Sequence, residues 1–297
     1  MMLSIIKNET IRMTVSELHL KNKMKQVSRL RLLLISFGCM VYSTLSYSQI
    51  ANYPGGVVEF SIIKESTDLP EVKYGLQDVA VLDAKHSWRI LLGIDLKTLP
   101  GEYLLYIKRQ TDDSTAYNLK FEIAQQESSF INTSIDSQIT AIYHDSFSDI
   151  EFNNSVEPEL PLKHPAQGTW ADYFGYININ SDSNVVDARN YISLTTTNLI
   201  AVTAPQNAII SRVVENTPKD NTNNKKNYTL FLDHGRGLFS IISGITDITI
   251  EPGNGVKAGA ILGKIYSDGN AGSEPNTLVW QTVLNGTYVN PSIFTKL

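Results

Sequence analysis

Histidines are the residues of this 297-residue chain with the clearest potential for metal chemistry. Four of them follow residue 48, namely His86, His144, His164 and His234. A catalytic zinc ion takes three histidine or carboxylate ligands and keeps one position open for water. No pair among the four has the His-x-His or His-x-x-x-His spacing that brings two rings onto one metal. The histidines by themselves therefore predict no zinc site.

A second feature is the segment Thr277–Gly286, which reads Thr-Leu-Val-Trp-Gln-Thr-Val-Leu-Asn-Gly. It resembles the C-terminal signature of the M23 (LytM/lysostaphin-like) zinc peptidases, which is His-x-His, an aromatic residue, a strand, Asn-Gly and a Val-x-Pro ending. Trp280 supplies the aromatic residue, and Asn285-Gly286 supplies the turn. Thr277 and Val279 stand in place of the two histidines. The segment thus keeps the frame of the family and lacks its chemistry.

The resemblance extends over residues 160–294 and has further anchors. Leu232–Ser240 is similar to the family's Asp-His-Gly-x-Gly-Leu-x-Ser strand and turn, and Pro252–Gly263 is similar to its Gly-x-x-Val-x-x-Gly-x-x-Ile-Gly hairpin. Counting from these segments and from Ala204-Pro205 carries the family's functional positions over to this chain. The three zinc ligands fall on Arg189, Ser193 and Val279, and the two assisting histidines fall on Gly244 and Thr277.

None of these five positions holds a residue type that supports zinc catalysis. Arginine is a fixed cation, valine has no donor atom, and a serine hydroxyl is a poor neutral ligand. Glycine and threonine do not titrate near neutral pH. A shift of the first motif brings Asp182 or Asp187 to the aspartate position, but neither has a histidine four residues before it. The resemblance therefore implies a catalytically degenerate domain with no cofactor, and with zinc only if displaced ligands bind it.

The resemblance also implies a long narrow groove along the sheet. An arginine near the former metal position would repel a divalent cation, and it could bind a carboxylate of a peptidoglycan stem peptide. The alternatives are an Arg189 that faces solvent or pairs with Asp187, and a His234 that is hydrogen-bonded to backbone in its turn. The candidate ligand-contacting residues are Arg189, Tyr191, His234, Thr277 and Trp280.

The first 48 residues have the order of a secretory signal peptide. A basic stretch at residues 24–31 precedes an apolar stretch at 32–42, and Ser46-Tyr47-Ser48 is a small-x-small cleavage site. The apolar stretch is shorter than the roughly 20 residues of a membrane span. Translation from Met24 is compatible with this leader. An uncleaved anchor and a lipoprotein modified at Cys39 are the alternatives.

The charge of the chain argues against one class of partner, and its cysteine content limits how the fold is stabilised. Residues 1–48 hold seven basic and two acidic residues, and removing them from the totals of 25 and 30 leaves 18 and 28, a net charge of -10. An acidic protein without a basic stripe is a poor nucleic-acid binder. Cys39 is the only cysteine and lies in the leader, so the mature chain has no disulfide and depends on packing for its stability.

Short strands and turns organise the rest of the chain, which predicts an all-β protein. The expected strands after the leader are residues 57–63, 80–82, 88–94, 102–108 and 117–123. Trp88–Tyr103 resembles the Ig-like N-terminal domain found in a subset of exported M23 proteins. The predicted organisation is a signal peptide at 1–48, an Ig-like domain at 49–125, a connector at 126–159 and an M23-like domain at 160–297.

These features together predict an exported pseudopeptidase of the periplasm or cell envelope, with no membrane span once the leader is removed. It would bind peptidoglycan or regulate a cell-wall hydrolase such as an amidase, because degenerate LytM domains are known as a class to activate amidases. Two alternatives stay open. One is an active zinc metalloendopeptidase with displaced ligands that cleaves peptidoglycan cross-links. The other is a structural or adhesion spacer of the envelope.

Overall fold

A computed structural model of the chain describes residues 45–48, 51–109, 116–126, 130–131, 156–179, 186–216, 226–265 and 276–297. The chain divides into two compact units, Met1–Ser46 and Tyr47–Leu297. Strand β1 (Leu45–Ser48) lies at their boundary. The predicted leader with Met24 and Cys39, apart from this strand, and nearly all of the predicted connector with His144 lie outside the described residues. The predicted domain boundaries and the Ig-like assignment stay predictions.

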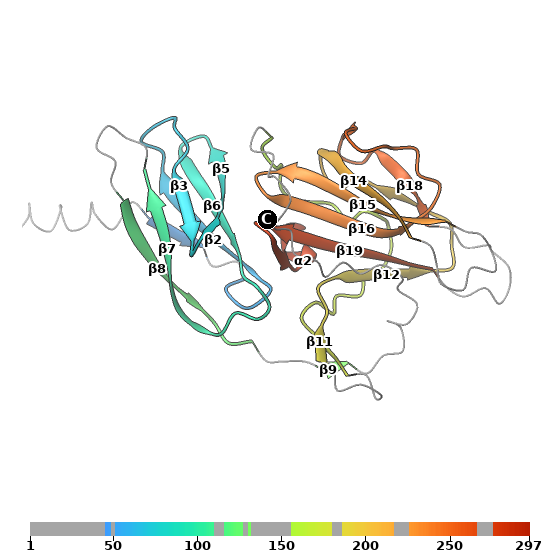
Figure 1. Cartoon of the computed structure of the whole chain (residues 1–297), viewed down its shortest axis with the longest axis horizontal. Coiled ribbons are helices and arrows are strands. Elements are labelled where there is room, and N and C mark those ends of the chain that lie inside the picture. Colours follow the sequence, from blue (N-terminus) through green and yellow to red (C-terminus); the bar gives the residue numbers. More distant parts are fainter. Residues whose placement is uncertain are drawn as a thin grey trace, which may run out of the picture. The chain divides into compact units, whose positions relative to one another are not determined.

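The first half of the second unit is built from two antiparallel sheets (Figure 1). The first sheet runs β2-β6-β5, and the second runs β4-β3-β7-β8. Strand alternation sets the buried face of these sheets. Strand β2 buries Val58, Phe60 and Ile62 on one face and leaves Glu59 and Ser61 half-buried on the other. The bounds are β2 Val57–Ile63, β3 Glu71–Tyr74, β4 Gln77–Asp78, β5 Ala80–Ala84, β6 Ser87–Gly93, β7 Gly101–Lys108 and β8 Ala116–Ile123.

The apolar faces of these two sheets share a core. Phe60 of β2 meets Phe121 of β8 edge to face, with ring centroids 5.4 Å apart. Ile90 of β6 and Leu105 of β7 belong to the same cluster of buried side chains. Five predicted strands are found at their expected positions within two residues, whereas the short polar strands β3 and β4 were not predicted.

A larger sheet dominates the second half of the chain (Figure 1). Its strand order is β12-β19-β16-β15-β14-β17, and β20 pairs with β19 at the end of a hairpin. Neighbours in this order are antiparallel. The bounds are β12 Ile192–Thr196, β14 Ala208–Asn216, β15 Asn227–Gly235, β16 Leu238–Ile245, β17 Gly255–Val256, β19 Asn276–Leu284 and β20 Thr287–Val289.

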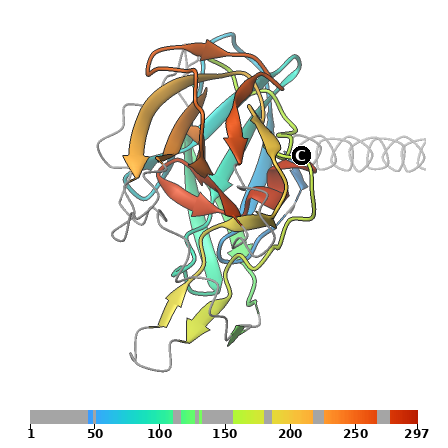
Figure 2. The same ribbon diagram turned by 90° about the vertical axis from the view of Figure 1, so that its right-hand side faces the viewer.

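Two smaller sheets and one helix complete the described part. Strands β13 (Ile200–Thr203) and β18 (Ile261–Ile265) form an antiparallel pair. Strands β9 (Phe130–Ile131), β10 (Ile177–Ile179) and β11 (Val186–Ala188) form a sheet that lies apart from the large one in both views (Figures 1 and 2). Helix α2 (Pro291–Phe294) begins at Asn290, whose side chain accepts a hydrogen bond from the Ser292 amide.

One hydrophobic cluster joins the two halves of the second unit. Leu91 of β6 and Val57 of β2 lie in the same cluster as Leu284 and Val289, which flank the Asn285-Gly286 turn. The Asn285 side-chain amide donates to the Leu91 carbonyl at 3.2 Å, and the Asn290 amide donates to the Gly55 carbonyl at 2.9 Å.

The prediction of an all-β protein is confirmed. No helix within the described ranges has the length and apolar character of a membrane span.

Candidate functional site

Strand pairing brings four of the five predicted metal and catalytic positions, Ser193, Gly244, Thr277 and Val279, together near the β12 edge of the large sheet. Ser193 of β12 lies directly opposite Val279 of β19, and Val279 lies opposite Ser243 of β16. Directly opposite residues in an antiparallel pair project to the same face of the sheet. Ser193, Ser243 and Val279 therefore line one face. Two of the three positions that the family resemblance assigns to zinc ligands are thus neighbours in space.

A row of hydroxyl groups extends this face toward β15. Thr229 of β15 lies opposite Ser243, and its hydroxyl donates to the Ser243 hydroxyl at 2.8 Å. The Asn216 amide donates to the Thr229 hydroxyl at 2.9 Å. Thr229 and Ser243 were not among the residues predicted from sequence, although strand alternation combined with the antiparallel register would have placed them. The row is neutral and hydrogen-bonded, so it has no group that could act as a general base.

Gly244 and Thr277, the two positions that correspond to catalytic histidines, also lie side by side. Gly244 has φ +91°, and a Cβ atom there would clash with the carbonyl oxygen of Thr277. The Thr277 hydroxyl lies 3.2 Å from the hydroxyl of Thr195, the residue opposite it on β12. Close backbone approach and positive φ both demand glycine here. The former catalytic corner is therefore filled by backbone and two threonine hydroxyls.

Trp280 does not line this face, contrary to its assignment as a groove residue. It lies between Ile192 and Ile242 in the register, and all three belong to the main hydrophobic core. Successive side chains of a strand alternate between faces, so Trp280 points away from the side that Val279 faces. Its exposed fraction is 0%. Trp280 is a core residue of the sheet.

Arg189 and Tyr191 are buried, and the Arg189 guanidinium lies beside the ring of Tyr191 and beside the exposed side chain of Tyr173. The Arg189 guanidinium lies 5.7 Å from the ring centroid of Tyr173 and 5.6 Å from that of Tyr191. Arg189 is 4% exposed and Tyr191 is 3% exposed, so the alternative of a solvent-facing Arg189 is wrong. The cation is held against two aromatic faces, an arrangement that stabilises a guanidinium removed from water. A carboxylate ligand would have to reach a guanidinium that is almost wholly removed from solvent.

His234 is a structural residue in this arrangement. It is fully buried, with Nδ1 2.9 Å from the Asn207 carbonyl oxygen and Nε2 2.9 Å from the Ser240 hydroxyl. A carbonyl oxygen only accepts, so Nδ1 carries the proton and Nε2 accepts from Ser240. Burial lowers the pKa of His234 to about 4, and the bond to Asn207 only partly opposes that shift. His234 is therefore neutral at physiological pH and has no surface for a ligand.

These side chains do not fit a catalytic zinc ion. Ser193 and Val279 offer one neutral hydroxyl and no nitrogen, and Arg189, at the third ligand position of the resemblance, is a cation that cannot ligate a metal. Within the described ranges, no three His, Cys, Asp or Glu side chains gather in a way that could hold a metal. His164 lies on the Trp280 side of the sheet, where its ring meets the Trp280 ring at 5.7 Å. It is not part of the Ser193–Val279 face.

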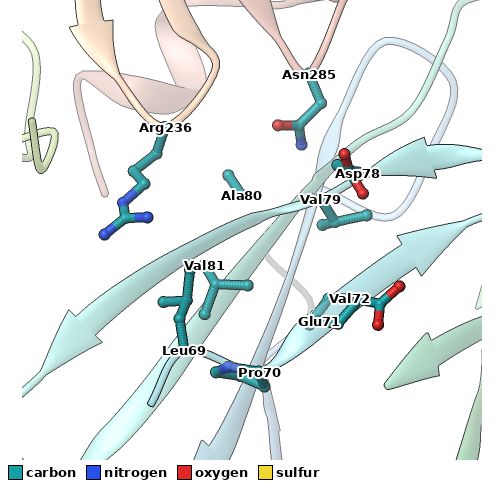
Figure 3. A pocket seen from close by; sticks show the side chains of 10 residues that line it. All are labelled: Leu69, Pro70, Glu71, Val72, Asp78, Val79, Ala80, Val81, Arg236 and Asn285. Carbon is teal, nitrogen blue, oxygen red and sulfur yellow. The ribbon is translucent and has the colours of Figure 1, made fainter. Parts of the chain in front are cut away.

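A cavity of about 240 Å³ lies elsewhere in the second unit, where two hairpin turns approach the first pair of sheets (Figure 3). Arg236 and Asn285 come from the turns after β15 and β19, and the Arg236 guanidinium is paired with Glu157 at 2.5 Å. Both residues have positive φ, +50° and +52°. The apolar wall comes from β3, β5 and the segments beside them, namely Leu69, Pro70, Val72, Val79, Ala80 and Val81.

Comparison with known proteins finds a family model that matches the part of the chain that forms most of this sheet. Residues 192–291 match peptidase family M23. A protein from Pseudomonas aeruginosa assigned to peptidase M23 superposes with a TM-score of 0.56 and 20% identity, covering 82% of this chain and 95% of that one. That likeness shows the fold. No curated protein sequence matches the chain.

Two further solved structures are more distant. Helicobacter pylori Csd3 has a TM-score of 0.37 and 10% identity, covering 85% of this chain and 76% of that one. A zinc-containing peptidase from Vibrio cholerae has a TM-score of 0.32 and 12% identity, covering 81% and 56%. At these TM-scores neither likeness bears on the function of this chain.

Proposed function

We propose that this chain, which carries a domain of peptidase family M23 at residues 192–291, is a non-catalytic protein of the cell envelope that binds peptidoglycan or a cell-wall hydrolase. The observation that carries the proposal is the register of strands β12, β19 and β16 near one edge of the large sheet. Ser193 lies opposite Val279, and Gly244 lies against Thr277, so the positions of the family's chemistry are adjacent. Their side chains supply neither a metal ligand set nor a titratable proton donor.

The scaffold around these positions is kept intact, which supports a binding role over simple decay. The Asn285-Gly286 turn is hydrogen-bonded to Leu91, and Trp280 is packed in the core. The secretory leader predicted from the sequence supports an envelope location. Peptidoglycan or an enzyme acting on it is the partner that the family resemblance favours, and an amidase is one candidate for such an enzyme.

Purified sacculi test both parts of the proposal. The full mature chain is incubated with sacculi, with and without added zinc, beside an active M23 endopeptidase as the positive control. We expect no release of soluble peptide fragments and retention of the chain in the pellet after centrifugation. Fragment release above the rate of a boiled sample would establish an active peptidase. Absence of the chain from the pellet would contradict direct peptidoglycan binding.

A spacer role is the second candidate, and the burial of the Ser193–Val279 face favours it. Val279 and Ser243 are 1% and 2% exposed, so the centre of that face is covered in this structure. A ligand would then need another surface. If neither sacculi nor an envelope amidase retains the chain, whereas its removal alters only the placement of attached proteins, the spacer role replaces the binding role.

A further inference from the structure

A cluster of three aromatic rings lies on the opposite side of the sheet from the Ser193–Val279 face. The rings of His164 and Trp170 are tilted against each other, with centroids 5.6 Å apart and 32° between their planes. Both meet Trp280 edge to face, His164 at 5.7 Å and Trp170 at 6.0 Å. Trp280 is fully buried, Trp170 is half-buried and His164 is exposed. The strand residue Trp280 thus supports two rings at the surface.

The backbone that carries the two rings is tightly held. The Trp170 indole donates to the Ala166 carbonyl at 3.1 Å, and the Lys163 amide donates to the Pro205 carbonyl at 2.9 Å. The Thr203 amide and hydroxyl both donate to the Pro165 carbonyl, at 2.6 and 3.3 Å. A binding surface that is fixed before its ligand arrives loses little conformational entropy on binding. The two rings are therefore preorganised.

The chemistry of this surface suits a sugar ring. A pyranose presents a patch of C–H groups to an aromatic face and a rim of hydroxyl and acetamido groups to polar neighbours, and aromatic side chains with a polar edge serve such mixed surfaces. Gln167 and Thr169, which lie between the two rings in sequence, are exposed and can hydrogen-bond to such a rim. Partial burial of its ring lowers the pKa of His164, while Asp172 opposes that shift. The ring is then mostly neutral at neutral pH, which suits an uncharged ligand.

We infer that His164 and Trp170 form a binding platform for a pyranose ring of a glycan strand, with Trp280 as its buried support. This inference rests on the proposed function, and it specifies the glycan part of peptidoglycan rather than its stem peptides as the ligand. It also assigns the contact to the Trp280 side of the sheet, away from the Ser193–Val279 face. The retained aromatic residue of the family frame thereby gains a physical purpose in this chain.

Calorimetric titration of the full mature chain with the β-1,4-linked tetramer of N-acetylglucosamine tests the platform. We expect saturable binding that His164→Ala and Trp170→Ala each weaken about five- to tenfold, the range expected for loss of one stacked ring. Trp170→Phe should retain most of the affinity. Tyr106→Ala is the matched control, because it removes a half-buried ring from β7 and should leave the affinity within about twofold.

The outcomes separate this inference from the proposed function. Unchanged affinity in both His164→Ala and Trp170→Ala overturns the platform, and so does binding of a stem peptide instead of the sugar tetramer. Because His164 is exposed, its alanine variant should fold, and an unaltered melting temperature confirms that. If the wild type pellets with sacculi and Trp170→Ala pellets equally well, the platform fails while the proposed function stands. If the tetramer binds and the alanine variants weaken that binding, but the wild type does not pellet with sacculi, the platform stands and direct peptidoglycan binding fails.

Discussion

At the scale of single residues, backbone space at the former catalytic corner is as restrictive as the missing side chains. Gly244 occupies a position where a histidine would be needed, yet its φ is +91° and its missing Cβ faces the Thr277 carbonyl oxygen. A side chain here would need both a left-handed backbone and a shift of β19. Restoring the family's chemistry by point substitution therefore requires movement of the strand as well.

Substitution of Gly244 by alanine tests this restriction. Gly253→Ala is a matched control, because Gly253 has a similar φ of +86° and no atom lies within 4 Å of the place that an added Cβ would take. We expect Gly253→Ala to cost about 1 kcal/mol from backbone strain alone, and Gly244→Ala to cost about 3 kcal/mol or more. Urea unfolding of the two variants measures the difference. Equal costs would show that β16 and β19 are not in close contact at this point.

His234 makes a prediction about acid sensitivity. Its pKa is about 4 in the folded chain and near 6.5 when unfolded, so between these pH values the unfolded chain binds more protons. The stabilisation from neutral His234 is complete above about pH 6.5 and is lost as the pH falls through about 4, which amounts to about 3 kcal/mol.

A His234→Gln variant should lose that pH-dependent component, so its stability should change less between pH 6.5 and 4 than that of the wild type. Chemical unfolding at a series of pH values measures this. His86→Gln is the matched control for the same substitution at an exposed histidine. A His234→Gln profile parallel to that of the wild type would mean that His234 is not buried as a neutral ring.

Part of the site could be predicted from sequence, and the rest depended on contacts distant in sequence. Side chains alternate between the two faces of a strand, which places Trp280 and Val279 on opposite faces. The core position of Trp280 could therefore have been predicted from the sequence. The Arg189 guanidinium lies over the ring of Tyr173, and strands β10 and β11 lie between these two residues in the chain. No spacing rule could have placed that ring against the guanidinium.

At the scale of elements, strong alternation predicted strands and weak or short patterns did not. β2, β6, β7 and β8 have seven or eight residues each, and their alternation or apolar content was visible in the sequence. Strands β3 and β4 have four and two residues of mostly polar character. They exist because they pair with β7 and with each other. Tertiary pairing, rather than local propensity, makes these strands.

The hairpin that joins β19 to β20 connects the two halves of the second unit through Asn285. Asn285 has φ +52°, and its amide donates to the Leu91 carbonyl. Asn285→Gly keeps the turn conformation and loses the hydrogen bond, so we expect a cost of about 1 to 2 kcal/mol. Asn285→Ala also strains the turn and should cost about 1 kcal/mol more. Thermal or urea unfolding measures both, and a neutral Asn285→Gly would mean that the bond to Leu91 does not stabilise the fold.

At the scale of the whole molecule, one hydrophobic cluster contains buried residues from both the first and the second sets of sheets. Leu91 is 1% exposed and lies in that cluster with Leu284 and Val289. A shared core predicts that both sets of sheets unfold together. This arrangement also explains why the Asn-Gly turn is kept when the catalytic residues are not.

Leu91→Ala should therefore destabilise both sets of sheets at once, by about 2 to 5 kcal/mol. Two single-tryptophan variants supply the probes, since Trp88 lies in β6 and Trp280 lies in β19. We expect the two fluorescence transitions to coincide in the parent chain and to shift equally with Leu91→Ala. Separate transitions would show that the two sets of sheets fold independently.

The zinc stoichiometry of the full mature chain tests the central claim most directly. Protein purified without chelators is loaded with excess zinc, passed over a desalting column and analysed by elemental mass spectrometry beside an active M23 peptidase. Because Arg189, Ser193 and Val279 supply no ligand set, we expect far less than one equivalent of bound zinc. One equivalent of tightly bound zinc, accompanied by cleavage of sacculi, would contradict the account.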